Sequence, residues 1–203
     1  MHSDEDYMRL ALQQAQRAMA DRHYPCGCVL VSAGSVVAAG RNEVYRRADP
    51  TRHGEMVALE TAFRALGNDS ILLPEVTAYV TAEPCMMCAG AFLQAGIHRV
   101  VFGARFPDSG AIPTADLLEQ YQLTNRIDWV GGILQEECGN LLRQWSDYKS
   151  AVLRQVRDAS PAGLEALLAR EGLTRARLAA WDWEQRGNAT SPPAAATRPM
   201  RTR

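Results

Sequence analysis

The spacing of hydrophobic and polar positions along the chain predicts a protein built from both helices and strands. Apolar residues recur at helical spacing over about residues 5–20, where Asp4 is placed to cap the helix. They recur again over residues 53–66, which end before Gly67. Two further helices are expected over Cys85–Ala95 and Leu134–Lys149.

Strand-like runs lie between these helices. Cys28–Val31 and Val36–Ala39 flank a short turn and predict a β-hairpin, and a polar loop from Gly40 to Arg52 is expected after it. The remaining strands are expected at Val76–Thr81, His98–Phe102 and Ile127–Val130. Strands that alternate with helices favour an α/β fold, in which a mixed sheet is covered by helices on both faces as three α/β/α layers.

The alternation ends near residue 150, which predicts one domain over residues 1–150. Beyond it, Pro161–Arg170 and Thr174–Arg186 have helical character, so a helical extension is expected over residues 151–187. Residues 188–203 are rich in Pro, Ala, Thr and Arg and are expected to form a disordered tail.

Charge is divided unevenly between these parts, although the formal net charge is only −1. Residues 1–150 carry 13 Lys and Arg against 18 Asp and Glu, whereas residues 151–203 carry 9 against 5. The acidic first part disfavours a broad nucleic-acid-binding face, because phosphate neutralisation needs clustered cations. No apolar run approaches the roughly 18 residues of a membrane span, and the acidic start of the chain lacks the pattern of a signal peptide. A cytoplasmic protein without a membrane partner is therefore expected.

Two predicted helices begin with residues that bind metals. His53 and Glu55 open one helix, while Cys85 and Cys88 open the other, so that both sulfur atoms lie on one side of its first turn. With His53 as the third ligand, the fourth position of a tetrahedral Zn²⁺ stays open to water, as in catalytic zinc sites. Zinc lowers the pKa of bound water, and Glu55 is placed to take the proton without binding the metal.

Spacing alone leaves other interpretations of the five cysteines open. A CxxC pair can be a redox pair or half of a structural zinc site, and Cys26 and Cys28 could join Cys85 and Cys88 in a four-thiolate site. Otherwise Cys26, Cys28 and Cys138 are expected to be buried and unpaired. A nucleic-acid-binding protein with a structural zinc is the alternative of another class.

The full pattern favours catalysis over these alternatives. An HxE motif upstream and a proline before the first cysteine complete the signature of zinc nucleobase deaminases. The predicted function is therefore a hydrolytic deaminase, which exchanges the exocyclic amine of a nucleobase for a carbonyl oxygen and releases ammonia.

Three segments resemble the cytidine-deaminase-like superfamily, and within it most closely the tRNA-specific adenosine deaminases: Asp49–Glu55, Thr81–Ala91 and Arg99–Arg105. The resemblance spans about residues 5–150. It implies a central five-stranded mixed sheet and a homodimer whose partner contributes to the active-site wall. It also implies one zinc ion per subunit held by His53, Cys85 and Cys88, proton transfer by Glu55, a base contact from the side-chain amide of Asn42, and backbone groups of Gly54 and Glu83 bordering the base.

Three departures from the tRNA enzymes favour a small free nucleobase or nucleoside as the substrate, with adenosine in a tRNA anticodon as the alternative. Gly54 stands where those enzymes usually have alanine, and the resulting His-Gly-Glu is similar to fungal cytosine deaminase. Phe106 stands where they have an acidic residue, and it could stack on a small base. The helix Leu141–Arg157 has few cations for an anticodon binder.

Two smaller signals each have two interpretations. The arginines around Asn42 either contact phosphate or balance the acidic residues of a solvated loop. These arginines are Arg41, Arg46, Arg47 and Arg52. The segment Trp181–Trp183 either closes over the substrate or, as is more usual for large aromatic side chains, docks the extension.

Overall fold

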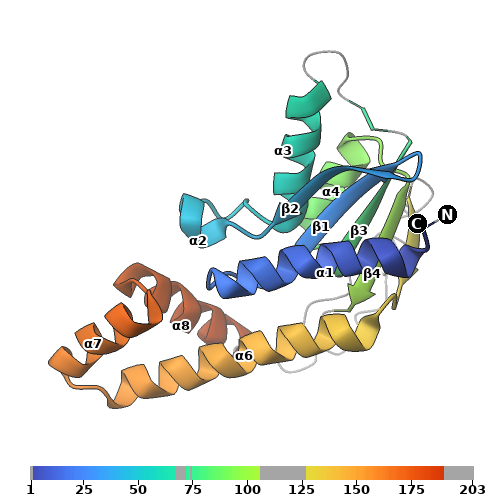
Figure 1. Cartoon of the computed structure of the whole chain (residues 1–203). Helices are drawn as coiled ribbons and strands as arrows, with labels where there is room; N and C mark the ends of the chain where they lie inside the picture. Colours follow the sequence, from blue (N-terminus) through green and yellow to red (C-terminus); the bar gives the residue numbers. More distant parts are fainter. Residues whose placement is uncertain (1, 67–71, 74, 106–126, 190–203) are drawn as a thin grey trace, which may run out of the picture. The chain divides into compact units, whose positions relative to one another are not determined.

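The computed structural model describes residues 2–66, 72–73, 75–105 and 127–189, and a five-stranded sheet lies at the centre of the first domain (Figure 1). The strands are β1 (Gly27–Ser32), β2 (Ser35–Arg41), β3 (Val76–Ala82), β4 (Arg99–Ala104) and β5 (Asp128–Gly131). Their order across the sheet is β2-β1-β3-β4-β5. β1 is antiparallel to both β2 and β3, while β3, β4 and β5 run parallel to one another. The predicted mixed five-stranded sheet is confirmed.

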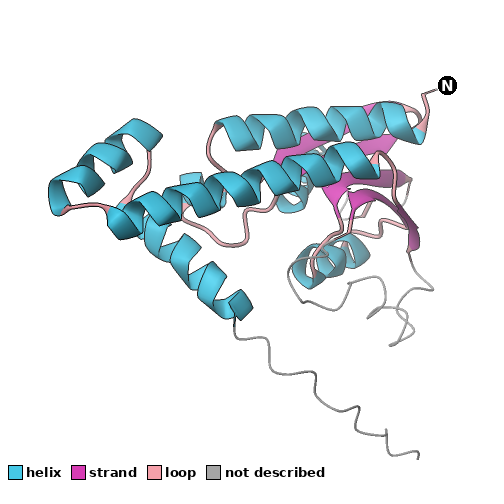
Figure 2. Cartoon of the chain, turned by 90° about the horizontal axis from the view of Figure 1, so that it is seen from below, coloured by secondary structure: helices cyan, strands magenta, loops and turns pink. Residues whose placement is uncertain are grey.

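Helices cover both faces of this sheet. α3 (Gly54–Leu66) and α4 (Met86–Gln94) lie on one face, while α1 (Asp4–Ala20) and the first half of α6 (Gln135–Asp158) lie on the other (Figures 1 and 2). Side chains of β1 alternate between the two layers: Leu30 packs in the α3/α4 core, and Val29 packs in the α1/α6 core. The predicted three-layer α/β/α arrangement is therefore confirmed.

The start of α1 differs from the expected cap at Asp4. Ser3 is the N-cap residue: its hydroxyl oxygen accepts the N–H of Asp6 at 3.2 Å, and its own N–H donates to the Asp6 carboxylate at 2.8 Å. Asp4 instead accepts hydrogen bonds from the guanidinium of Arg99 at 2.8 Å and from the hydroxyl of Tyr79 at 2.7 Å. The first turn of α1 thus ties the helix to β3 and β4.

The loop expected between Gly40 and Arg52 contains one helical turn, α2 (Val44–Arg47). It ends at Ala48, whose backbone is left-handed with a φ of 50°. None of the residues of α2 is buried, so it has no apolar periodicity that the sequence could show.

α6 continues to Asp158, past its expected end at Lys149. Apolar residues at Val152, Leu153 and Val156 continue the helical spacing, which explains the greater length. A boundary between two compact units falls between Asp147 and Tyr148, inside this helix. The domain division at residue 150 stays a prediction, because no linker of different composition marks it.

The second unit also contains α7 (Pro161–Glu171) and α8 (Arg175–Ala189). Trp181 is fully buried and packs edge-on against Tyr148 of the same unit, with the ring centroids 6.0 Å apart. This burial disfavours a role of Trp181 at the substrate. The side chain of Trp183 lies outside the described part of the chain.

The expected tail begins later than predicted. α8 continues through Ala189, so residues 188 and 189 are helical, and residues 190–203 lie outside the described residues. Among the helices that the structure describes, none has the length and apolar character needed to cross a bilayer.

Candidate active site

The residues predicted to carry chemistry gather at one edge of the sheet. Because β2 and β3 are both antiparallel to β1, their carboxyl ends meet at this edge, where Asn42 follows β2 and Glu83 follows β3. The helices of this face begin here too: His53 directly precedes α3, and Cys85 is the N-cap residue of α4. The carboxyl ends of strands are the usual ligand site of open α/β sheets.

His53, Cys85 and Cys88 bring three metal-binding atoms together. The Nδ1 atom of His53 lies 3.6 Å from each of the two sulfur atoms, and the sulfur atoms are 3.7 Å apart. With Zn–S bonds of about 2.3 Å and Zn–N bonds of about 2.0–2.1 Å, a tetrahedral ion separates its sulfur ligands by about 3.7 Å and sulfur from nitrogen by about 3.5–3.6 Å. The three side chains therefore fit zinc without rearrangement.

Cys26 and Cys28 do not belong to this group, since within the described residues only His53, Cys85 and Cys88 place their ligand atoms within 4.8 Å of one another. This contradicts the four-thiolate alternative. A closed structural site would need a fourth protein ligand, whereas a group of three leaves one tetrahedral position open.

The electrostatics of the group favour a thiolate beside the imidazole. Hydrogen bonds, first with Cys88 and then with His53, lower the pKa of the Cys85 thiol to about 4. The hydrogen bond with Cys85 also raises the pKa of His53, while the pKa of Cys88 is raised because it shares its proton with Cys85. A coordinating cation removes such a proton outright, so the group is suited to a divalent metal.

Glu55 lies in the first turn of α3 and is only 2% exposed. Burial raises the pKa of its carboxyl group above the ordinary value. Its Oε2 atom accepts a hydrogen bond from the Cys26 thiol at 3.7 Å. A buried carboxyl group with a raised pKa beside a metal site can both take up and release protons, so the geometry agrees with the predicted shuttle. The role itself stays a prediction.

Asn42 follows β2 at the same edge of the sheet and is 4% exposed. Its N–H donates to the carbonyl oxygen of Cys26 at 3.0 Å, and its Oδ1 atom accepts the N–H of Val44 at 3.2 Å. Because Oδ1 is engaged, the amide N–H groups are what this side chain can offer to a base.

Gly54 and Glu83 lie at the same edge of the sheet as Asn42, at the start of α3 and after the end of β3. A Cβ atom on Gly54 would lie 2.9 Å from the carbonyl oxygen of Cys26, so α3 begins in close contact with the backbone before β1. The N–H of Glu83 donates to the carbonyl oxygen of Ala104 at 2.8 Å, which fixes the backbone after β3 against the end of β4. The base contacts of Gly54 and Glu83 stay predictions. Phe106 lies outside the described residues.

The four arginines around the site are all paired with carboxylates. Arg41 pairs with Asp21 at 3.0 Å, and Arg52 pairs with both Asp49 and Glu60. Arg46 and Arg47 share Glu43, at 3.5 Å and 3.1 Å. This pairing favours the solvated-loop interpretation over a dedicated phosphate site.

Cys26 is the residue of this site that sequence reasoning missed. It was expected to be a buried cysteine without a partner, but its thiol contacts Glu55 and its carbonyl contacts Asn42. The available signal was its position just before β1, at the sheet edge where β2 and β3 end.

A mixed sheet with a His-Cys-Cys group and a buried glutamate at two helix starts defines the class of zinc-dependent deaminases. Comparison with known proteins agrees. The family model described as the cytidine and deoxycytidylate deaminase zinc-binding region matches residues 1–104. The chain belongs to this family, and it has a zinc-binding deaminase domain.

Curated relatives narrow the resemblance further. The chain is 36% identical over 168 residues to the tRNA-specific adenosine deaminase of Bacillus subtilis, which covers 82% of this chain and 99% of the relative. It is also 36% identical over 164 residues to the enzyme of that name from Haemophilus influenzae, covering 76% of this chain and 94% of the relative.

The chain is also similar to a solved structure of a tRNA deaminase. It comes from studies of A-to-I editing by tRNA deaminases at the wobble position of transfer RNA. It superposes with a TM-score of 0.61 and 35% identity, over 67% of this chain and 98% of that one.

Proposed function

We propose that this protein is a tRNA-specific adenosine deaminase, which converts adenosine to inosine in the anticodon loop. The observation that carries the proposal is the 36% identity to the Bacillus subtilis enzyme over 99% of that enzyme's length. This favours the tRNA alternative over the free base or nucleoside that was the first expectation from the sequence. A tRNA substrate also favours action in the cytoplasm.

The reaction needs a metal ion and a proton carrier, and the site offers side chains for both. His53, Cys85 and Cys88 would hold zinc, which supplies an activated water molecule for attack on the carbon that bears the amine. Glu55 would accept a proton from the attacking water and deliver it to the ring nitrogen. It would then carry the second proton to the amine, which leaves as ammonia, so that water and amine become carbonyl and ammonia.

Asn42 and the surrounding backbone orient the base during these transfers. Its side-chain amide is buried and held by Val44, so it can donate to a base without a loss of side-chain freedom on binding. The buried position of Glu55 excludes bulk water from the proton path.

A homodimer is part of the proposal. A groove of about 530 Å³ between α3 and α4 has an apolar floor that includes Met56, Phe63 and Ala91, with Arg52 and Glu60 among the polar residues that also line it. Met86 and Met87 on the same layer are 50% and 36% exposed. A second copy of the chain would cover these groups. Ala91→Glu should shift the molar mass measured by light scattering from dimer to monomer if this face is the interface.

The test of the proposed function is deamination of an anticodon stem-loop that carries adenosine at the wobble position. Inosine is read as guanosine after reverse transcription, and ammonia release is measured in parallel with free adenosine, adenine, cytosine and guanine. The matched control is a stem-loop with the adenosine moved to another loop position. Turnover of the wobble adenosine alone is the expected result, whereas turnover of a free base or nucleoside without the stem-loop would overturn the tRNA proposal.

A further inference from the structure

Cys26 contacts residues that reach the site from two other segments, the end of β2 and the start of α3. It directly precedes β1 and is 6% exposed. Its sulfur atom lies 3.7 Å from Oε2 of Glu55, toward which the thiol donates its hydrogen. The contact joins residues 29 positions apart in the sequence, and both side chains are buried.

The backbone of Cys26 makes two further contacts within the site. Its carbonyl oxygen accepts the N–H of Asn42 at 3.0 Å. The same oxygen is so close to Gly54 that a Cβ atom there would lie at 2.9 Å. One residue therefore touches the carboxylate that carries protons, the residue that carries the base-contacting amide, and the start of α3.

The thiol is also kept in the form that can donate. Burial, together with the nearby Glu55 carboxylate, raises the pKa of Cys26 well above its usual range. A neutral thiol has one hydrogen to give, and the carboxylate of Glu55 is the acceptor in contact with it.

We propose that Cys26 is a positioning residue of the active site, whose thiol fixes the Oε2 atom of Glu55 while its carbonyl fixes Asn42. A carboxylate on a two-bond stem can rotate, and a donor on one oxygen holds the other oxygen toward the reacting water and base. The role rests on the proposed deaminase function, because it acts through Glu55.

The structure provides a matched control for this role. Cys28 lies two residues after Cys26, within β1, and its side chain packs in the same core, where it is fully buried with Leu30 and Ala38. Replacing either cysteine by alanine removes a buried sulfur atom from the same hydrophobic core. Only Cys26→Ala removes the hydrogen bond to Glu55.

The first experiment compares Cys26→Ala, Cys26→Ser and Cys28→Ala on the wobble-adenosine stem-loop. We expect kcat to fall about 3- to 10-fold in Cys26→Ala, the usual loss for one hydrogen bond, with KM and zinc content within about twofold of wild type. Cys26→Ser should restore most of the activity, because a hydroxyl also donates. Equal kcat losses in Cys26→Ala and Cys28→Ala, or no rescue by serine, would overturn the proposal.

The second experiment does not depend on turnover. The S–H stretching band of Cys26 is isolated in the infrared difference spectrum between wild type and Cys26→Ala. A donated thiol absorbs at lower frequency, so Glu55→Gln should move this band to higher frequency, because an amide accepts more weakly than a carboxylate. A band that does not move overturns the assignment. If wild type turns over no substrate, the proposed function fails, while the infrared result still decides the contact.

Discussion

On each face of the sheet a helix has an acidic residue in its first turn, Asp4 in α1 and Glu55 in α3. The two carboxyl groups differ in burial and in pKa. On the α1 side, Asp4 is 31% exposed and accepts hydrogen bonds from Arg99 and Tyr79. On the α3 side, Glu55 is 2% exposed and accepts its hydrogen bond from a thiol. The cation beside Asp4 lowers its pKa, whereas burial raises that of Glu55. The first carboxylate is suited to hold a helix in place, and the second to move a proton.

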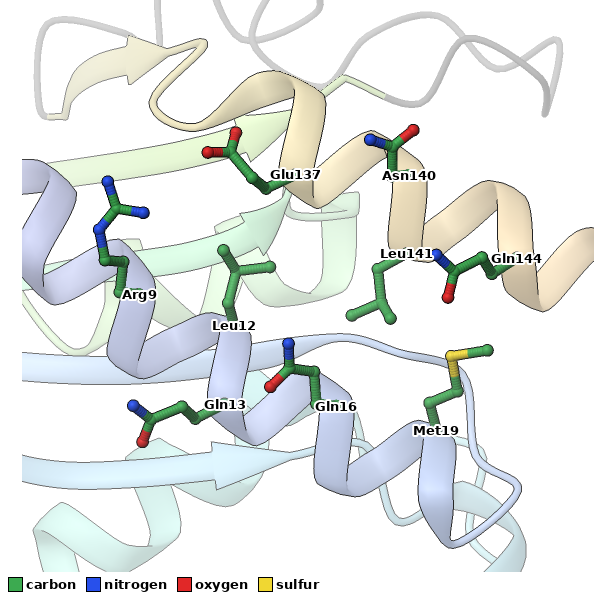
Figure 3. A pocket seen from close by; sticks show the side chains of 9 residues that line it. All are labelled: Arg9, Leu12, Gln13, Gln16, Met19, Glu137, Asn140, Leu141 and Gln144. Atoms are coloured by element: carbon green, nitrogen blue, oxygen red, sulfur yellow. The ribbon is translucent and has the colours of Figure 1, made fainter.

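The two faces of the sheet also differ in the side chains that line their open spaces. Between α1 and α6 lies an open hollow of about 540 Å³, lined mostly by aliphatic and amide side chains (Figure 3). Leu12 and Leu141 face each other across it, while Gln13, Gln16 and Asn140 lie around them. In the described part of this face no three metal-binding side chains meet, as they do at the starts of α3 and α4. Within the described residues, the metal-binding group therefore lies on the α3/α4 face, while packing and the hydrogen bonds of Asp4 hold α1 on the other face.

The largest expected effect is the loss of kcat when Glu55 is replaced, which distinguishes this carboxyl group from that of Asp4. Glu55→Gln should lower kcat about 10²- to 10⁴-fold, because the proton shuttle is lost, while zinc content stays unchanged. His53→Ala should lose both turnover and metal. Single-turnover deamination and metal analysis of the purified variants check this. A Glu55→Gln protein with wild-type kcat would remove the distinction between Glu55 and Asp4.

The next effect tests how α3 is placed. Gly40→Ala would put a Cβ atom 2.2 Å from the carbonyl oxygen of Gly54 and 2.4 Å from the nitrogen of Ala58, so α3 must move away from β2. We expect a loss of about 3 kcal/mol in the free energy of unfolding, together with reduced kcat, because α3 carries Glu55. Urea denaturation and the deamination assay measure the two effects.

Gly139→Ala on the opposite face is the matched control. The nearest atom to its new Cβ would be the end of the flexible Arg143 side chain, at 3.2 Å. In the interior of α6 this change should stabilise the protein by about 0.5–1 kcal/mol and leave kcat unchanged. A Gly40→Ala variant as stable and active as Gly139→Ala would mean that α3 does not need its close approach to β2.

A smaller effect is expected at Asp4, and it concerns stability alone. The hydrogen bond from Arg99 lowers the pKa of Asp4 below its unfolded value, so the stabilisation is complete above about pH 4. It is lost as the pH falls through the folded-state pKa. Asp4→Asn should therefore lower the free energy of unfolding by about 0.5–1 kcal/mol at neutral pH. The difference from wild type should vanish in strong acid, and kcat should not change. Urea denaturation at several pH values checks this, and a difference that grows in acid would contradict the assignment.

The smallest effect is expected at Arg46, near the site but paired with Glu43. Arg46 is 53% exposed, and its ion pair at 3.5 Å is worth little in water. Arg46→Ala should change KM for the stem-loop by less than about twofold if the loop is merely solvated. A larger rise in KM that grows at low salt would show that this arginine meets phosphate.

Helix starts made much of this site predictable from the sequence. His53, Cys85 and Cys88 were identified from the HxE motif together with the proline and the two cysteines of the second motif, and both motifs begin a predicted helix, where spacing along the chain fixes which side chains share a side. The strands were predictable for a similar reason, since alternate positions such as Val29 and Leu30 must face different layers.

Contacts that depend on the assembled sheet were not predictable in this way. The Cys26 thiol reaches Glu55 because Cys26 precedes β1 at the sheet edge where α3 begins. Its position before a strand is a signal for the sheet edge, but no spacing along the chain predicts the contact itself. Ser3 and Asp4 are both good capping residues; the local capping box with Asp6 favours Ser3, whereas the contact of Asp4 with Arg99, far along the chain, could not be predicted. α2 was missed because none of its residues is buried.

The separation of the metal-binding atoms along the chain also links metal supply to stability. His53 and Cys85 are 32 positions apart and meet only when α3 and α4 are both packed on the sheet. An ion bound there prefers the native chain over the unfolded one. By mass action, each tenfold rise in free zinc above the dissociation constant then adds about 1.4 kcal/mol to the free energy of unfolding. The free zinc concentration thereby acts on the fraction of folded protein as well as on its rate of turnover.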